Sequence, residues 1–274
     1  MDTKKQTLCV INGGGLRQIE CATGCLKALQ QLGVQPDCYW GSSAGAAIAG
    51  LMASGLSAAE LETIIRKTRV SDLYQPYSKW RQLLSFIPGY TPALLNPDGM
   101  YRLLSAHITP QAMEKALVTV TRCRDGKSMR CGATAKTIMA SAAIPCVFPP
   151  VEINGVRYED GGVKNMIPTP KISEIDTYEH IYFILCNSDI NNDESSGMLA
   201  KAVEAFSRTM DREEVGFFEA GWAELPNVTV IKPTAYPSSL LEWSDCYGLI
   251  NHAYEYTLFT MQTNAAITGK GVQQ

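Results

Sequence analysis

The chain has 274 residues, of which 46% are hydrophobic and 19% are charged, and its formal net charge is −3 at pH 7. A chain of this length and composition can bury a sizeable core in one large domain or two small ones, which argues against intrinsic disorder. The small negative charge argues against a nucleic-acid partner, because such a partner usually requires a basic face on the protein.

The N-terminal part of the chain predicts two strand-to-helix units in succession. Residues 7–11 form a short apolar run that ends in three glycines, and apolar side chains recur at helical spacing over residues 16–32. Residues 38–40 predict a second strand, which runs into a Gly-Ser turn, and residues 44–52, rich in Ala and Gly, predict a second helix. This order is typical of a parallel sheet with helices packed on it.

A cap insertion is expected around residues 70–110. A capping box, Ser57 with Glu60, begins the helix that precedes it. Four prolines and several aromatic residues lie within residues 70–99, which indicates irregular structure with short helices and no sheet. Residues 77–87 mix aromatic and basic side chains; membrane contact is one interpretation, and cover for a core is slightly favoured.

The rest of the chain predicts further strands and helices of the same domain. The dipeptide Asn154-Gly155 is the strongest short hairpin signal, and its hairpin leads directly into Asp160. Strands are predicted at residues 117–123, 151–153, 156–158, 181–186 and 228–231, and helices at residues 134–143, 199–210 and 249–263. Because no internal repeat, low-complexity tract or obvious linker is present, we predict a single α/β domain over residues 1–274, in which helices flank a central, mostly parallel sheet.

The cysteine pattern does not point to a metal site. The nine cysteines are scattered, odd in number and without a C-x-x-C pair. Cys21 and Cys25 are four residues apart and would share a helix face, but a zinc site needs two more ligands at suitable spacing. We therefore interpret the cysteines as reduced, small core residues and predict no metal and no cofactor.

The hydrophobic runs are too short for targeting or membrane segments. The apolar run at residues 8–11 is far shorter than the apolar region of a signal peptide. The longest stretch of low charge, residues 44–59, falls short of the roughly 20 apolar residues of a membrane span. We therefore expect a cytoplasmic location.

The segment Gly41-Ser42-Ser43-Ala44-Gly45 matches the pattern G-x-S-x-G. A serine at a strand-to-helix turn adopts a strained backbone conformation, and small neighbours two residues away on each side relieve the crowding. The turn also places Ser43 at a helix N-terminus, where backbone amides and the helix dipole favour negative charge. The pattern is short, so an ordinary structural turn is the alternative to a nucleophile.

Three consecutive glycines, residues 13–15, stand at the first strand-to-helix turn. Their unblocked amides indicate either a phosphate cradle or an oxyanion hole for Ser43. A dinucleotide site of the form G-x-G-x-x-G would need glycine in place of Gln18, and a Walker lysine–serine pair is absent, so nucleotide binding is disfavoured. One strand–helix–strand unit brings both turns to the carboxyl edge of a parallel sheet, where such sheets bind ligands.

A serine nucleophile needs a base, and the chain has three histidines, His107, His180 and His252. We expect a structural or surface role for each, although Ser43, Asp160 and His180 or His252 formally keep the order of a hydrolase triad. Asp160, which follows a hairpin and precedes two glycines, is the preferred base. A carboxylate with a reference pKa of about 3.9 is a weak base, but it can act in a partly desolvated site beside an oxyanion hole.

Together these motifs resemble the patatin-like phospholipase family. Residues 13–17 look like its glycine-rich oxyanion loop, residues 41–45 like its nucleophile elbow, and residues 160–162 like its Asp-Gly-Gly segment. Residues 140–150 are also similar to the family's approach to that aspartate. The resemblance covers residues 7–170 well.

The resemblance implies a three-layer α/β/α fold and a serine–aspartate dyad without histidine. Ser43 would attack the acyl carbon, and Asp160 would take its proton and later activate water. The amides of Gly13, Gly14 and Gly15 would hold the oxyanion. The implied substrate is a lipid ester, above all a phospholipid, with no cofactor and with transient contact to a membrane surface.

The chain departs from the family pattern at Asn12, where the family has aspartate, and at Gln18, where it has glycine. The backbone donors should survive both changes, and the alternative is an inactive or ligand-gated relative that binds lipid or a partner. Arg17 borders the loop; it would either meet a lipid phosphate, whose oxygens match a guanidinium, or be an ordinary arginine of a helix surface. The oligomeric state does not follow from the sequence.

Overall fold

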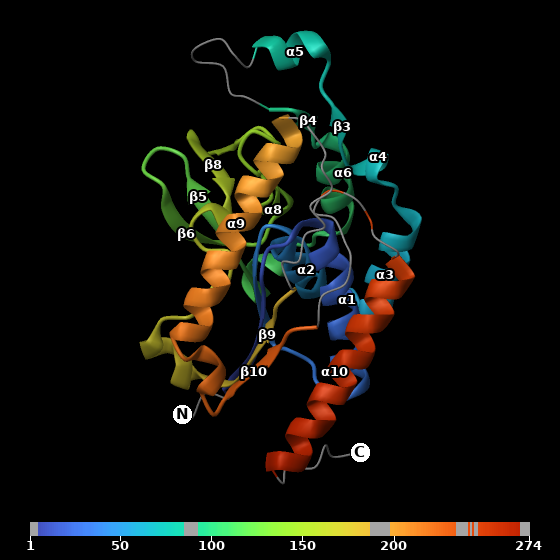
Figure 1. The fold of residues 1–274 in the computed structure, drawn as a ribbon, viewed down its shortest axis with the longest axis vertical. Helices are drawn as coiled ribbons and strands as arrows, with labels where there is room; N and C mark the ends of the chain where they lie inside the picture. The colour runs from blue at the N-terminus through green and yellow to red at the C-terminus, as the bar shows by residue number, and fades with distance from the viewer. Residues whose placement is uncertain are drawn as a thin grey trace.

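The computed structural model describes residues 5–84, 93–186, 198–233, 241, 243 and 246–268. An eight-stranded sheet, seen at the centre of Figure 1, has the order β10-β9-β1-β2-β5-β8-β7, and β6 also pairs with β5. The strands are β1 (Gln6–Ile11), β2 (Cys38–Ser42), β5 (Ala116–Arg122), β6 (Lys127–Gly132), β7 (Val151–Ile153), β8 (Val156–Asp160), β9 (Tyr178–Ile184) and β10 (Val228–Ile231). The five strands from β10 to β5 are parallel, which confirms the predicted mostly parallel sheet.

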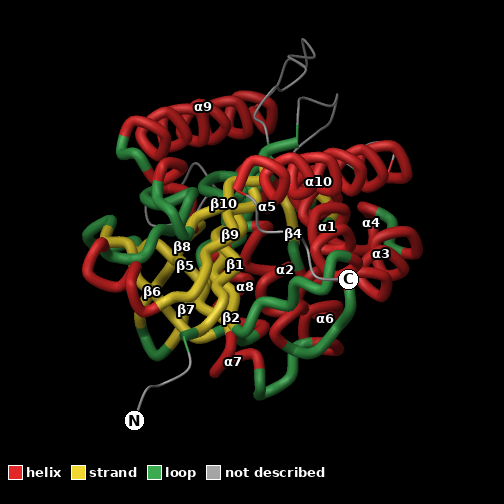
Figure 2. Tube along the Cα trace, turned by 90° about the horizontal axis from the view of Figure 1, so that it is seen from below, coloured by secondary structure: helices red, strands yellow, loops and turns green. Residues whose placement is uncertain are grey.

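Helices cover both faces of the sheet in three layers. Figure 2 shows the sheet between α9 on one side and α1, α2, α3, α6 and α10 on the other. The helices are α1 (Gly15–Gln31), α2 (Ala44–Ala53), α3 (Ala58–Lys67), α4 (Val70–Leu73), α5 (Lys79–Leu84), α6 (Asp98–His107), α7 (Ala112–Lys115), α8 (Ala135–Ser141), α9 (Met198–Glu219) and α10 (Cys246–Thr268). Three 3-10 helices add η1 (Gly161–Val163), η2 (Ile172–Thr177) and η3 (Trp222–Glu224).

Strand β1 shows why both faces must be covered. Successive side chains of a strand point to opposite faces, and those of β1 are apolar on both. Leu8 and Val10 belong to the core beneath α9, whereas Cys9 and Ile11 belong to the core beneath α1, α2 and α10. The short apolar run therefore forms a central strand, as predicted.

The register of the sheet brings the predicted motifs to the same edge of the sheet. Ile11 of β1 lies opposite Gly41 of β2 in a parallel pair, so the turns after both strands leave the sheet at the same edge. Ser42 lies opposite Thr119, and Asp160 pairs with the residue of β5 that follows Thr119. The glycine loop, the Gly-Ser turn and Asp160 thus meet although they are far apart in the sequence.

The region around residues 70–110 differs in part from its prediction. It holds the short helices that were expected, but β3 (Gln75–Pro76) and β4 (Leu95–Asn96) form a small antiparallel sheet, so the expectation of no sheet is wrong. A two-residue ladder is too short to leave a periodic signal, and Pro76 argued against a strand. Of residues 77–87, the last three lie outside the described residues. Trp80 is 79% exposed, so its side chain does not cover a core.

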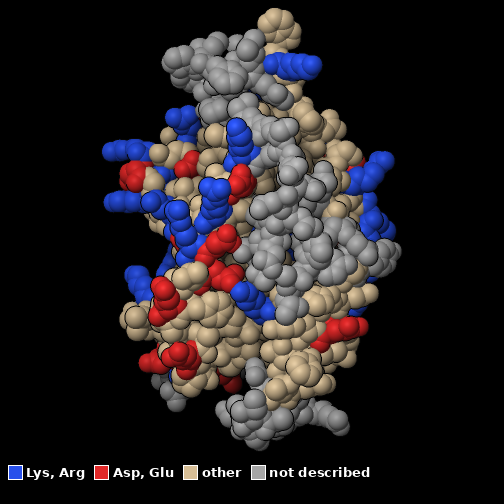
Figure 3. All heavy atoms as spheres, viewed as in Figure 1, with Lys and Arg blue, Asp and Glu red and all other residues tan. Residues whose placement is uncertain are grey.

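The surface carries charges of both signs. On the face in Figure 3, basic side chains gather over the edge that contains β5, β6 and β8, with acidic side chains among and below them. Within the described part of the chain, every helix is too short or too polar to cross a bilayer.

Candidate active site

Ser43 occupies the turn between β2 and α2 in a strained conformation, with φ 52° and ψ −124°. Residues with a side chain rarely adopt such a positive φ. The turn is too tight for larger neighbours: a Cβ on Gly41 would lie 2.2 Å from the carbonyl oxygen of Gly45, and a Cβ on Gly45 would lie 2.3 Å from that of Ile11. The strained turn predicted from the two glycines is therefore present.

The side chains of Ser43 and Asp160 are in direct contact. The Ser43 hydroxyl donates a hydrogen bond to Oδ2 of Asp160 at 2.7 Å. The other oxygen, Oδ1, accepts a hydrogen bond from the N–H of Gly162, also at 2.7 Å. A Cβ on Gly161 would lie 2.2 Å from the carbonyl oxygen of Thr119, so this glycine allows the loop after Asp160 to cross β5 closely. The carboxylate is thereby fixed in one orientation toward the serine.

Burial sets the proton affinity of Asp160. The side chain is fully buried, and burial raises its pKa to about 7, while the hydrogen bonds from Ser43 and Gly162 act in the opposite direction. The nearby charge of Glu159 adds a smaller increase to this pKa. A base with a pKa near neutral can both take a proton from a hydroxyl and return it to a leaving group.

Ser141, the last residue of α8, anchors the backbone of Ser43. Its hydroxyl accepts a hydrogen bond from the N–H of Ser43 at 2.8 Å and donates one to the carbonyl of Thr119 at 2.6 Å. The N–H of Ser43 is therefore engaged and unavailable to a substrate. Sequence reasoning placed Ser141 within a segment similar to the family but assigned it no role; a serine in that Ala-rich run was the only signal.

The glycine-rich loop lies against the nucleophile. A Cβ on Gly13 would lie 3.1 Å from Cβ of Ser43. The N–H of Gly13 donates to the carbonyl of Met166 at 3.1 Å, so its expected role as an oxyanion donor is not supported in this conformation. The N–H groups of Gly14 and Gly15, at the start of α1, have no acceptor within the described part of the chain.

The two departures from the family pattern both anchor this loop. Oδ1 of Asn12 accepts a hydrogen bond from the N–H of Cys186 at 3.2 Å, and Nε2 of Gln18 donates one to the carbonyl of Ile184 at 3.3 Å. Both side chains are buried. The side chains of Asn12 and Gln18 attach the two ends of the glycine-rich loop to the end of β9, so the loop remains anchored despite both departures.

Arg17 points away from any surface. Its side chain is fully buried, and Nη2 lies 4.0 Å from Sδ of Met210. The interpretation as an ordinary arginine of a helix surface is therefore wrong. Contact with a lipid phosphate is not supported either, because solvent does not reach the guanidinium.

Met166 fills the space between the two loops of the site. A Cβ on Gly13 would lie 2.1 Å from its Sδ, and a Cβ on Gly162 would lie 2.7 Å from it. Met166 belongs to an apolar cluster with Phe206 and Met210 of α9. Ser43 is only 2% exposed, so the dyad is closed to solvent in this conformation.

The hydrogen bonds of His107 and His180 go to groups other than Ser43 and Asp160. Nδ1 of His107 lies 2.9 Å from the carbonyl oxygen of Leu103, and Nε2 of His180 lies 2.9 Å from the hydroxyl of Thr229. His252 lies in α10. The triad that remained open in the sequence is not assembled in this structure. Among residues described here, no three His, Cys, Asp or Glu side chains are grouped to hold a metal ion.

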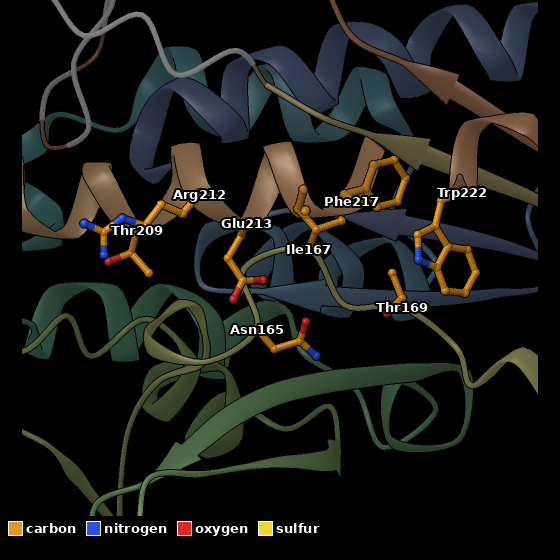
Figure 4. A pocket seen from close by; sticks show the side chains of 9 residues that line it. Asn165, Ile167, Thr169, Thr209, Arg212, Glu213, Phe217 and Trp222 are labelled. Atoms are coloured by element: carbon orange, nitrogen blue, oxygen red, sulfur yellow. The ribbon is translucent and has the colours of Figure 1, made fainter. Parts of the chain in front are cut away.

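A separate pocket of about 460 Å³ lies between α9 and the segment that follows η1 (Figure 4). Asn165 and Ile167 line it, whereas the residue between them, Met166, faces the dyad. Glu213 of α9 points toward Asn165 in this pocket, and Trp222 stands at its other end. Neither Ser43 nor Asp160 is part of its wall.

A parallel sheet that presents a serine on a strained strand-to-helix turn, bonded to an aspartate, defines a class of α/β proteins with a serine–aspartate pair. The sequence model of the patatin-like phospholipases matches residues 9–171, more than half of the chain. The protein therefore belongs to the patatin-like phospholipase family, whose members are lipid-hydrolysing enzymes. None of the curated proteins matches the chain.

The solved structure of VipD agrees with this fold. VipD from Legionella pneumophila is 15% identical, with a TM-score of 0.50 over 95% of this chain and 67% of VipD. ExoU in its complex with SpcU from the type III secretion system of Pseudomonas aeruginosa is 17% identical, with a TM-score of 0.47 over 94% of this chain and 52% of the other. This chain thus spans about half the length of ExoU. Identities this low bear on the fold alone.

Proposed function

We propose that the protein is a lipid acyl hydrolase that cleaves fatty acyl esters through Ser43 and Asp160. The observation that carries the proposal is the 2.7 Å hydrogen bond between these two side chains at a strained strand-to-helix turn. Family membership supports the same chemistry. We treat residues 1–274 as one acyl hydrolase domain in which residues around 70–110 form a cap.

In the first half of the reaction, Asp160 takes the proton of Ser43 while Oγ attacks the acyl carbon of the ester. The carbonyl oxygen becomes negative, and the N–H groups of Gly14 and Gly15 donate to it at the positive end of α1. When the tetrahedral intermediate collapses, the C–O bond to the alcohol breaks and Asp160 returns the proton to the leaving oxygen. An acyl ester of Ser43 remains.

In the second half, water attacks the acyl-serine. Asp160 takes a proton from the water, the same amides hold the oxyanion, and collapse returns the proton to Oγ of Ser43 as the fatty acid leaves. These steps need no group beyond the side chains and amides named, so we propose no cofactor. The apolar cluster around Met166 favours an apolar acyl group, and we propose a phospholipid at a membrane surface as the substrate.

The test is hydrolysis of a p-nitrophenyl ester and of phospholipid vesicles, together with labelling by a fluorophosphonate probe. Ser43→Ala should abolish labelling and lower both activities by roughly 1,000-fold or more. Asp160→Asn should lower both activities by a comparable factor. Ser42→Ala is the matched control, because its buried hydroxyl has no hydrogen-bond partner among the described residues and the variant should keep its labelling.

Three outcomes contradict the proposal. Unchanged activity in Ser43→Ala removes the nucleophile assignment. Absence of both labelling and hydrolysis in the wild type, with the variants folded, favours a relative that binds lipid without cleaving it. Collapse of activity on replacement of a single histidine, with Asp160→Asn still active, would replace the dyad by a triad.

A further inference from the structure

A partly open apolar cavity lies among α1, α2, α3 and α6, with about 60 Å³ of free space. Its walls come from aliphatic and aromatic side chains of all four helices, among them Leu51, Ile65 and Leu104. Protein interiors are usually packed to the density of organic crystals, so the atoms that line a void of this kind lack van der Waals partners on one side. An apolar void also stays dry and accepts apolar ligands.

The first turns of α1 and α2, which follow the glycine-rich loop and the turn that carries Ser43, contribute to the wall of this cavity. Leu16, which lines it, directly follows the oxyanion donor Gly15 in the first turn of α1. Ala47, which also lines it, lies in the first turn of α2, four residues after Ser43. Leu16 further belongs to the same apolar cluster as Met166. Leu16 therefore connects the wall of the cavity with the apolar cluster that covers Ser43 and Asp160, although neither of these two residues lines the cavity itself.

The far end is closed by Trp243. This half-buried side chain lines the cavity, and its indole N–H donates to the carbonyl of Thr68 at 2.8 Å. Two residues earlier, the carbonyl of Leu241 accepts a hydrogen bond from the hydroxyl of Tyr74. The indole therefore forms an end wall of the cavity. It is hydrogen-bonded to the residue that follows α3 and does not itself belong to a helix.

We propose that this cavity is the acyl-chain pocket of the enzyme and that Trp243 sets the length of chain it accepts. The proposal rests on the proposed function, since it assigns the acyl group attacked by Ser43 to this pocket. The free space of about 60 Å³ exceeds the roughly 10–15 Å³ that one water needs, so a short segment of acyl chain fits without movement. A longer chain is expected to meet the Trp243 indole and to displace it.

The test measures binding and needs no catalysis. The Ser43→Ala protein is titrated with the methyl ester of cis-parinaric acid, whose fluorescence rises in an apolar site, and bound ester is displaced with saturated methyl esters of six to sixteen carbons. Leu103→Trp fills the cavity from the half-buried side of α6 and should raise the Kd at least tenfold. Leu225→Trp, at a half-buried leucine outside the cavity, should change the Kd less than twofold.

The second pair of variants lengthens the pocket. Trp243→Ala should move the best displacing ester to a longer chain, because each additional buried methylene strengthens binding roughly fourfold. Trp222→Ala, at the half-buried tryptophan of the pocket in Figure 4, should leave the displacement series unchanged. Thermal unfolding shows whether each variant is folded, and if Leu103→Trp is not, the tryptophan pair decides.

The outcomes separate this inference from the proposed function. Equal effects of Leu103→Trp and Leu225→Trp, or a displacement series that Trp243→Ala does not move, overturn the acyl pocket even if the wild type hydrolyses esters. Binding that responds to the cavity variants as expected, in a protein whose wild type hydrolyses nothing, supports the pocket and contradicts the hydrolase.

Discussion

Replacement of Asp160 by asparagine tests whether burial really governs this carboxyl group. Its pKa is raised from the ordinary 3.8 to about 7, chiefly by burial. A raised pKa means that the folded protein holds the proton more tightly than the unfolded chain, so the group's contribution to stability is fully present below pH 3.8 and is lost as the pH rises through 7. Three pH units at about 1.4 kcal/mol each give up to about 4 kcal/mol.

Asparagine carries no charge at any of these pH values, so the variant lacks this loss. We expect the free energy of unfolding of Asp160→Asn, relative to the wild type, to increase between pH 4 and pH 7 by about 2–4 kcal/mol and then to stay constant. Urea denaturation at pH 4.5, 5.5, 6.5, 7.5 and 8.5 measures it. Asp211→Asn, at an exposed site of α9, is the control. A difference that is flat, or that falls with pH, would refute the argument.

Three further predictions concern the support of the site and its approach to lipid. Ser141→Ala removes two hydrogen bonds from buried backbone groups and should lower the free energy of unfolding by about 2 kcal/mol, measured in urea, and should slow fluorophosphonate labelling. Gly13→Ala should displace the Met166 side chain and slow labelling about tenfold or more with a smaller loss of stability, which a labelling time course and a thermal melt would separate. Trp80→Ala, at a side chain that is 79% exposed, should weaken sedimentation with phospholipid vesicles by a few fold, whereas Phe259→Ala, 70% exposed on α10, should not.

The central strands and the three site motifs follow from local sequence. Ser43 needs small neighbours at two fixed positions, and Gly41 and Gly45 supply them within five residues. Asn154 and Gly155 both have positive φ, as the hairpin signal requires, and they deliver Asp160 to the sheet. Each of these features is decided by steric limits on a few consecutive residues, which is why a sequence can reveal it.

The contacts between motifs could not be predicted in the same way. Ser141 is 98 residues from the serine whose N–H it accepts, and the carbonyl of Met166, far along the chain, accepts the N–H of Gly13. Arg17 follows the glycine loop, and the sequence left a phosphate contact and a helix-surface position open, yet its side chain is fully buried beside Met210. Such outcomes depend on which helices pack together, and periodicity within one segment does not contain that information.

The closed site and the raised pKa of Asp160 have one cause, and this leads to a final prediction. The apolar cluster around Met166 excludes water from the carboxylate, so its pKa stays near 7 only while the site is dry. A long acyl chain bound beside Asp160 keeps water out, whereas a short ester leaves room for water and lets the pKa of Asp160 fall toward 3.8.

The pH profile of kcat, which reports the enzyme–substrate complex, should therefore rise at a higher pH for a dodecanoyl ester than for an acetyl ester. The profile of kcat/KM, which reports the free enzyme, should break at the same pH for both. Coincident kcat profiles would mean that the substrate does not control the hydration of Asp160. Burial in the free protein would then not account for the pKa of Asp160 in the enzyme–substrate complex.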